Sequence, residues 1–390
     1  MASSVPIRPA SDPLEGWSLP AWTYRDPEFF ALEQDRIFAR AWQIVCHESD
    51  LADVGDWHTL DYLGESVLVV RGADRALRAF ANVCRHRGSR ILDGDRGCAR
   101  KLVCPYHAWT YGLDGRLTGV PDAASYPGLD KARHGLAPVA LETWRGFVFV
   151  RLVDEGPSVA EMMAPYAATI APYRFEDLRA LGRVTLRPRA VNWKTIGDNY
   201  SDGLHIAVAH PGLTRLFGRS YGVEAEEHVD RMWGEMQDRP SANRSERAYQ
   251  RLLPRVPHLP EAAQRRWLYF KLWPNLAFDI YPDQIDFMQW LPVSPGASLI
   301  REIGYAIPDA RREMRAARYL NWRINRRVNA EDTALIARVQ QGMASRSFSV
   351  GPLSDKEVCL RGFCRKMREL IPEAREERQP PPGWSKPRPS

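Results

Sequence analysis

The chain contains little cysteine and no long apolar run, and each absence excludes a class of protein. Six cysteines in 390 residues are too few for a disulfide scaffold, so we expect reduced thiols and a location in the cytoplasm. No run of about 18 apolar residues is present, so we expect no membrane-spanning helix and no membrane partner. The first residues, MASSVPIRPASDPLEGW, lack the apolar segment of a signal peptide.

The chain also lacks a large excess of either positive or negative charge. The 54 lysines and arginines and the 48 acids leave a net charge of +6, and the basic residues form no long run. No nucleic-acid-binding motif is present, so we expect no nucleic-acid partner. The sequence also lacks a G-x-G-x-x-G motif and the plant-type ferredoxin cysteine spacing, so we expect no flavin or NADH site within the chain.

Sequence patterns divide the chain into four parts. Residues 1–40 contain a helical pattern, and residues 41–153 form an all-β unit of β-branched runs broken by Gly and Asp. Residues 154–380 mix helices and strands, and residues 381–390 predict an extended tail. The sequence therefore predicts an α+β fold with two main domains, in which the N-terminal segment packs on the second domain.

Three stretches of the third part show clear local patterns. Residues 188–213 predict a strand running into a helix that Pro211 ends. Residues 267–306 predict several strands, and residues 309–345 predict one long helix or two.

Two short segments of the all-β unit each offer one cysteine and one histidine. Cys84-x-His86 and Cys104-x-x-His107 have seventeen residues between the first histidine and the second cysteine. Structural zinc sites usually place two cysteines together and two histidines together. An asymmetric [2Fe–2S] cluster instead takes both thiolates on one iron and both imidazoles on the other. The spacing favours the cluster, with structural zinc as the alternative.

The paired motif resembles the Rieske family. Respiratory-chain members carry one further cysteine in each loop, and these two cysteines form a disulfide. Ser89 and Tyr106 stand at the matching positions here, and Cys98 has no obvious partner. The resemblance therefore implies the ferredoxin and oxygenase type, which lacks this disulfide.

A second group of metal-binding residue types follows in NWKTIGDNYSDGLHIAVAHPG, which contains Asp202-x-x-His205-x4-His210. Two histidines five positions apart lie about 140° apart around an ideal helix, so the spacing alone favours a buried and a capping histidine. The segment, however, resembles the catalytic helix of the Rieske non-haem iron oxygenases. This resemblance implies that His205 and His210 bind mononuclear Fe(II). It also implies that Asp202 bridges to a cluster histidine, His107, of a neighbouring subunit.

The third iron ligand should be a carboxylate far along the chain. A helix over NAEDTALIARVQQGM places Asp332 on the face of an apolar stripe, and a buried carboxylate needs a partner such as a metal. Glu331 falls on the solvated side of this helix. The stripe consists of Leu335, Ile336 and Val339. The resemblance, through the acidic pair and VQQG, places the ligand at Asp332. The alternatives are Glu331, Asp279, Asp283 and Asp286.

The resemblance covers roughly residues 20–372 and implies a complete oxygenase component. An all-β Rieske [2Fe–2S] domain would precede a helix-grip-like catalytic domain with an antiparallel sheet. The implied enzyme uses electrons from the cluster and O₂ at a non-haem Fe(II) to hydroxylate or oxidatively demethylate a small organic substrate. NADH would act through a separate flavin reductase, with or without a ferredoxin, and the oxygenase would be a homotrimer.

Basic residues surround the cluster motifs, and they fit an acidic electron donor and ordinary solvated surface equally well. They are Arg85, Arg87, Arg90, Arg100 and Lys101.

The substrate class rests on the resemblance, which is greatest to choline, betaine and carnitine oxygenases. We therefore lean slightly to a quaternary ammonium or N-methyl compound, which needs an aromatic cage. Candidates for the cage, which core packing also explains, are Trp233, Trp267, Tyr269, Trp273, Phe278, Phe287 and Trp290. Arg215 and Arg219 fit either a substrate carboxylate or the surface. The alternatives are hydroxylation or dioxygenation of an aromatic acid, a non-catalytic electron-transfer protein and a zinc-stabilised binding module.

Overall fold

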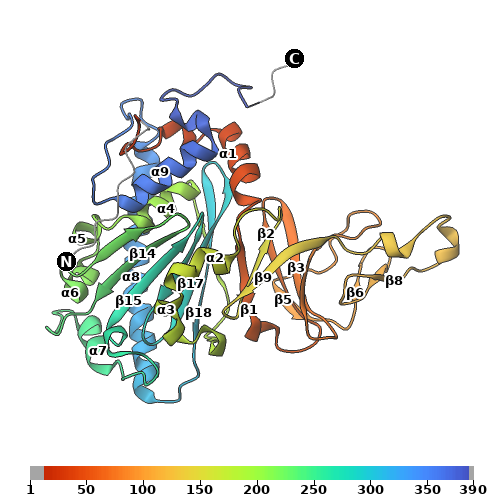
Figure 1. Ribbon diagram of the computed structural model, residues 1–390, viewed down its shortest axis with the longest axis horizontal. Coiled ribbons are helices and arrows are strands. Elements are labelled where there is room, and N and C mark those ends of the chain that lie inside the picture. Colours follow the sequence, from red (N-terminus) through yellow and green to blue (C-terminus); the bar gives the residue numbers. More distant parts are fainter. Residues whose placement is uncertain (1–12, 386–390) are drawn as a thin grey trace.

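The computed structural model describes residues 13–385 and contains two large sheets side by side (Figure 1). The first sheet has seven antiparallel strands in the order β1-β10-β9-β4-β3-β2-β5. Its strands are β1 (Gln43–His47), β2 (Asp56–Tyr62), β3 (Glu65–Arg71), β4 (Leu77–Ala81), β5 (Arg96–Cys98), β9 (Pro138–Trp144) and β10 (Phe147–Arg151). A small sheet beside it consists of β6 (Leu102–Val103), β7 (Thr110–Tyr111) and β8 (Leu117–Gly119).

The second large sheet is also antiparallel and has the order β11-β18-β17-β16-β15-β14-β13, with β12 paired to β18. Its strands are β11 (Arg179–Ala180), β12 (Thr185–Arg189), β13 (Gly222–Ala225), β14 (Val229–Glu235), β15 (Arg266–Leu272), β16 (Leu276–Ile280), β17 (Ile285–Ser294) and β18 (Ala297–Ala306). The all-β unit and this mixed unit agree with the predicted α+β class, and residues 267–306 form strands as predicted.

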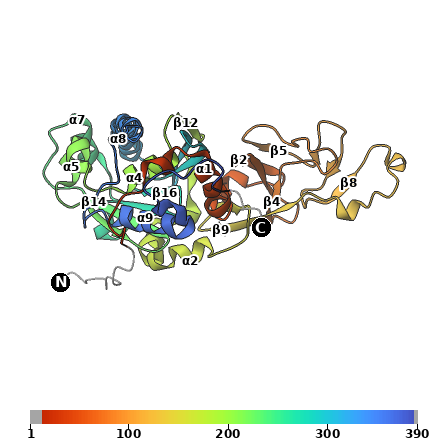
Figure 2. The same cartoon turned by 90° about the horizontal axis from the view of Figure 1, so that it is seen from above.

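Helices cover both faces of the second sheet, and in Figure 2 α7 and α8 lie on one side and α2 on the other. The α-helices are α1 (Pro27–Glu33), α2 (Val159–Met163), α3 (Ala167–Ile170), α4 (Trp193–Ser201), α5 (Ile206–Ala209), α6 (Pro211–Phe217), α7 (Arg244–Leu252), α8 (Arg312–Gly342) and α9 (Val358–Leu370). Helix α8 buries Met314, Ala317, Asn321 and Ile324, and this 3–4 spacing places one face of the helix on the sheet. No helix among residues 13–385 is long and apolar enough to cross a bilayer.

A shared apolar core joins the two sheets. Phe147 and Phe149 of β10 pack in one cluster with Phe278 of β16 and Phe287 of β17. The ring centroids of Phe147 and Phe278 are 5.0 Å apart. Burial of this much aromatic surface stabilises one arrangement of the two sheets.

The N-terminal and C-terminal segments pack together on the second unit. Helix α1 begins at Pro27, where Asp26 accepts a hydrogen bond from the Phe29 amide, and the cluster of α1, α4 and α9 buries Phe29. The described end of the predicted tail, residues 381–385, folds back, with the Trp384 ring 5.8 Å from that of Trp22. Residues 386–390 of that tail and residues 1–12 lie outside the described part of the chain.

Two local predictions are corrected or settled. The predicted helical stretch 309–345 contains a single long helix, α8, over Arg312–Gly342. The helix predicted to end at Pro211 ends at Ala209, and Pro211 is the first residue of α6, where its missing amide hydrogen costs nothing. Strand β12 overlaps the start of the predicted stretch, and the helical part that follows is divided into α4 and α5 by a break at residues 202–205.

The molecule is elongated. The two Cys/His segments lie at one end of it, and the region of His205 and His210 lies at the opposite end. Figures 1 and 2 show β6 and β8 at one end of the long axis and α5 at the other. The segments Cys84–His86 and Cys104–His107 adjoin β4 and β6, whereas His205 and His210 flank α5.

Candidate metal centres and substrate cavity

Two tight loops bring the predicted cluster ligands together at the tip of the first unit. In the first loop the Gly88 amide donates to the Cys84 carbonyl, and in the second the Ala108 amide donates to the Cys104 carbonyl. The fourth residue after each cysteine therefore adopts a positive φ, which is 71° at Gly88 and 54° at Ala108. Glycine takes this conformation without cost, but alanine takes it only where surrounding contacts hold it.

The donor atoms of these loops fit an iron–sulfur cluster. Cys84 and Cys104 are buried, and the ring centroids of His86 and His107 are 4.7 Å apart. Nδ1 of each histidine is buried and has no hydrogen-bond partner among residues 13–385. Buried polar atoms are rarely left unsatisfied, so two free imidazole nitrogens beside two thiols indicate a metal group. The Tyr111 hydroxyl lies 3.3 Å from Cys84 Sγ.

At the other end of the molecule, a break between α4 and α5 places two histidines around one point. Helix α4 ends at Ser201, His205 precedes α5, and His210 lies between α5 and α6 with φ −115° and ψ 75°. Because the backbone leaves helical geometry at His210, the separation of about 140° expected on an ideal helix does not apply. The Nε2 atoms of His205 and His210 are 3.0 Å apart.

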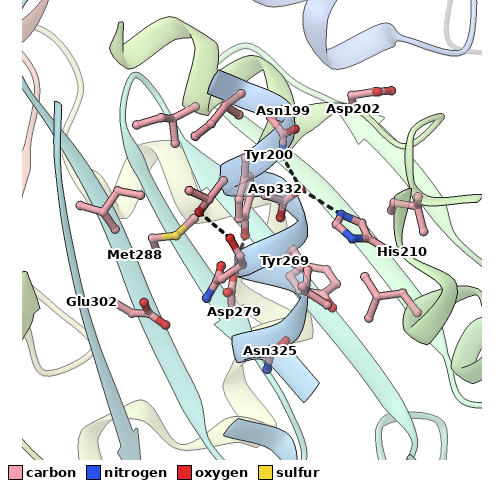
Figure 3. Close-up of a pocket in the computed structure, with 18 of the residues that line it drawn as sticks. Asn199, Tyr200, Asp202, His210, Tyr269, Asp279, Met288, Glu302, Asn325 and Asp332 are labelled. Carbon is pink, nitrogen blue, oxygen red and sulfur yellow. Dashed lines mark hydrogen bonds and ion pairs between the residues drawn. The ribbon is translucent and has the colours of Figure 1, made fainter. Parts of the chain in front are cut away.

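Asp332 of α8 completes this group. Its Oδ1 lies 2.9 Å from His210 Nε2 and 3.6 Å from His205 Nε2, and Figure 3 shows Asp332 facing His210. Two imidazoles and one carboxylate that converge in this way match the donor set of non-haem iron sites with open coordination positions. The residues present therefore fit a mononuclear iron.

Neighbouring polar groups hold each of the three side chains in place. Asp202 Oδ2 lies 3.1 Å from His205 Nδ1, and Glu331 Oε2 lies 2.9 Å from His210 Nδ1. Asn199 donates a hydrogen bond of 2.8 Å to Asp332 Oδ1. A carboxylate on Nδ1 holds the proton there and leaves Nε2 free for a metal.

The prediction for Glu331 was therefore wrong. Its side chain is only 23% exposed, and it contacts His210 and, through Oε1, Arg327 at 3.1 Å. The apolar stripe assigned to α8 was also partly wrong, because Ile336 is buried whereas Val339 is 45% exposed.

Proximity shifts the pKa values of these groups in opposite directions. Burial alone lowers the pKa of His205, but hydrogen bonds to Asp202 and Asp332 outweigh it and raise that pKa to about 9. Burial alone raises the pKa of Asp332, but hydrogen bonds from His205 and His210 outweigh it and lower that pKa. Protons and metal compete for the same nitrogens, so metal affinity falls as the pH falls.

The three other aspartates proposed as third ligands lie apart from this point. Asp279 and Asp286 line the same cavity from β16 and β17. Asp283 accepts a hydrogen bond of 2.6 Å from the Tyr249 hydroxyl.

A cavity of about 980 Å³, including its open mouth, adjoins the two histidines and Asp332. Besides apolar side chains it is lined by tyrosines, acids and arginines, which are Tyr200, Tyr221, Tyr269, Tyr281, Asp279, Asp286, Glu302, Arg187 and Arg189.

The predicted cage residues are mostly part of the core. Of the seven aromatics, only Tyr269 lines this cavity, and Trp267, Phe278, Phe287 and Trp290 are fully buried. Arg215 forms a bidentate pair with Glu246 instead of facing the cavity.

The basic residues near the cluster motifs are largely at the surface. Arg90 pairs with Asp61 at 2.7 Å. Arg87 lies over the Tyr106 ring, 4.9 Å from its centroid, and Tyr106 is 56% exposed.

Comparisons with known proteins agree with these two centres. A family model for the Rieske [2Fe–2S] domain matches residues 41–140, and one for the ring hydroxylating alpha subunit (catalytic domain) matches residues 175–373. The carnitine monooxygenase oxygenase subunit of Escherichia coli (strain K12) is 31% identical over 354 residues, which cover 88% of this chain and 89% of that protein. The glycine betaine monooxygenase oxygenase subunit of Chromohalobacter salexigens is 38% identical over 196 residues, 50% of this chain and 44% of that protein.

Solved structures show the same fold. A quaternary ammonium Rieske monooxygenase superimposes with a TM-score of 0.77 at 25% identity, over 92% of this chain and 96% of that one. Naphthalene 1,2-dioxygenase with bound indole superimposes with a TM-score of 0.74 at 21% identity, over 91% of this chain and 92% of that one. The chain therefore belongs to the Rieske non-haem iron oxygenases, as a catalytic alpha subunit with a Rieske [2Fe–2S] domain and a catalytic domain for mononuclear iron.

Proposed function

We propose that this oxygenase removes an N-methyl group from a small cationic amine, or hydroxylates such a compound. The observation that supports this most is the cavity beside His205, His210 and Asp332, whose lining combines four tyrosines with five acids and two arginines. Tyrosine faces and carboxylates both attract a cation. The carnitine and glycine betaine relatives support the same substrate class.

Each site residue has a proposed role. Cys84, Cys104, His86 and His107 hold the cluster, and His205, His210 and Asp332 hold the mononuclear iron. When bound, these groups supply stored electrons and the activation of O₂. The protein contributes by fixing Nε2 of His205 and His210 through Asp202 and Glu331, and Asp332 through Asn199.

The overall reaction balances with two external electrons. A protonated N-methyl amine, O₂, two electrons and two protons give the demethylated ammonium, formaldehyde and water. Hydroxylation of the methyl carbon forms a C–O bond, and the C–N bond then breaks with release of formaldehyde. The electrons come from a separate reductase. We further propose that a flavin and NADH, with or without a ferredoxin, deliver them to the basic surface around Arg87.

We also propose a homotrimer in which electrons pass between subunits. The cluster loops and α5 lie at opposite ends of one chain (Figures 1 and 2), so a neighbour must bring the two centres together. Apolar side chains are exposed beside both centres. Leu204 is 43% and Val208 86% exposed near His205, and Tyr106 is 56% exposed near His107. In this arrangement Asp202 receives a hydrogen bond from His107 of the neighbour. The first domain would end near residue 153, just after β10.

Glu331 is expected to set the iron affinity through His210. Glu331→Ala removes the acceptor for His210 Nδ1 and should weaken iron binding about 10–100-fold, whereas Glu331→Gln, which keeps an acceptor oxygen, should weaken it less. The measurement is the fraction of mononuclear iron retained during dialysis against a graded chelator. Glu313→Gln on the exposed first turn of α8 is the matched control, and equal retention in Glu331→Ala and this control would contradict the role.

The substrate class is tested by O₂ uptake with a surrogate reductase and NADH. We expect uptake matched by formaldehyde release with at least one N-methyl cation, and none in His205→Ala. Uptake matched instead by a hydroxylated aromatic acid would show that the proposed substrate class is wrong.

A further inference from the structure

The cavity contains a pair of carboxyls that form no ion pair with any lysine, arginine or histidine in the described part of the chain. Asp279 and Asp286 are direct partners in the register of β16 and β17, and both line the cavity. Two like charges directly opposite each other destabilise a sheet. Their hydrogen-bond partners among residues 13–385 are neutral, namely Tyr200 and Tyr281 for Asp279 and Gln284 for Asp286.

Glu302, another acid of the cavity lining, is different. Glu302 Oε2 lies 2.9 Å from a guanidinium nitrogen of Arg187, so its charge is offset. Outside the iron site, Asp279 and Asp286 are therefore the two acids of the cavity lining that no guanidinium or ammonium among residues 13–385 contacts.

The fold makes room for this pair. Gly304 lies opposite Asp286 in the register of β17 and β18, and a Cβ at Gly304 would lie 2.6 Å from Asp286 Oδ1. Any larger residue would push the carboxyl out of its place. Burial, with the neighbouring charge of Glu302, raises the pKa of Asp279 to about 7 and raises that of Asp286 well above its usual range. Both carboxyls therefore lack a cation that would stabilise their ionised forms.

One member of the pair, Asp279, is connected with the iron site through two consecutive residues of α4. Asn199 bonds Asp332, and the next residue, Tyr200, donates a hydrogen bond of 2.5 Å to Asp279 Oδ1. Figure 3 shows these two contacts side by side. A cation bound at Asp279 would thus hold its N-methyl group near His205, His210 and Asp332.

Resting on the proposed function, we propose that Asp279 and Asp286 select an ammonium that carries an N–H, a protonated secondary or tertiary N-methylamine, over its quaternary analogue. A quaternary ammonium has no hydrogen to donate, and its recognition depends on aromatic faces. It would cover the two carboxyls without adding any donor to the neutral Tyr200, Tyr281 and Gln284, and a buried charged group needs stronger compensation than these supply. A protonated amine satisfies both the charge and the hydrogen bond.

The test compares matched pairs that differ by one N-methyl group. The probes are N,N-dimethylglycine against glycine betaine, N,N-dimethylethanolamine against choline, and trimethylammonium against tetramethylammonium. Binding to the holoenzyme is measured by calorimetry, and formaldehyde per O₂ is measured with each probe. We expect the N–H member to bind about tenfold tighter or more, since one charge-assisted hydrogen bond has this effect.

Two variants connect the preference to the acids. Asp286→Asn and Asp279→Asn should bring the ratio within each pair close to one without loss of iron, which the metal content verifies. A quaternary member that binds as tightly as its partner, or a preference unchanged in both variants, would overturn the inference. Formaldehyde from quaternary probes alone would leave the proposed function intact and overturn only this inference. Turnover of aromatic acids alone would overturn both.

Discussion

Asp332→Ala is expected to lose the mononuclear iron and to keep the cluster. Three donor atoms converge on the site, at distances of 2.9–3.6 Å, and removal of the Asp332 carboxylate leaves the two imidazoles of this set. The cluster loops lie at the opposite end of the molecule, so the substitution should leave the cluster unchanged. Iron analysis should therefore fall from three irons per chain to two, with an unchanged Rieske visible and electron paramagnetic resonance spectrum. Substrate oxidation should fall to background.

The matched control is Asp279→Asn, which removes another carboxylate of the same cavity. It should keep three irons per chain. Full iron content in Asp332→Ala, or loss of the iron in Asp279→Asn, would contradict the assignment of the third ligand.

The second large effect is expected at Asp202. Its carboxylate contacts His205 Nδ1 at 3.1 Å, and side-chain exposure of 20% leaves it accessible to a neighbouring subunit. Asp202→Asn keeps an acceptor for His205 and should retain the iron, but it removes the negative charge that would face His107 of the neighbour. Reduction of the cluster by the donor should be unchanged, whereas electron transfer to the iron site should slow by about 10–100-fold or more. Rapid-mixing spectroscopy of the reduced cluster measures both steps.

Mixed oligomers test the route between subunits directly. Chains with Asp332→Ala keep the cluster, and chains with Cys84→Ser keep the iron site, so each variant alone should be inactive. Oligomers purified through two different tags should regain part of the activity, because the cluster of one chain serves the iron site of the next. Mixed oligomers that stay inactive, although they contain both centres, would contradict transfer between subunits.

The residues with local signals could be predicted from the sequence. Cys84, His86, Cys104 and His107 lie in two short motifs, and the structure brings them together at the tip of the first unit. The meeting of His205 and His210 could not be derived from spacing alone. It depends on the break between α4 and α5 and on the backbone conformation of His210.

The cavity lining was the least predictable part, because it depends on which face of each strand points to α8. Phe278 and Phe287 were candidates for the cage, but they belong to the core between the two sheets. Their neighbours Asp279 and Asp286 line the cavity instead, as the alternation of side chains along a strand requires. Acids within otherwise apolar strands were the signal that could have identified this face. Glu331 was predicted on the solvated side of α8 because a helical wheel shows only the helix itself. It does not show that His210, from another element, contacts this side.

The most direct test is a single turnover without any reductase. The protein is reduced chemically, freed of reductant and mixed with O₂ and the best-bound N-methyl cation. If this chain is itself the oxygenase, the cluster should reoxidise and formaldehyde should form in wild-type protein, and neither should occur at this rate in His205→Ala. Equal reoxidation in both proteins, without any product, would contradict the account and indicate a protein that only transfers electrons.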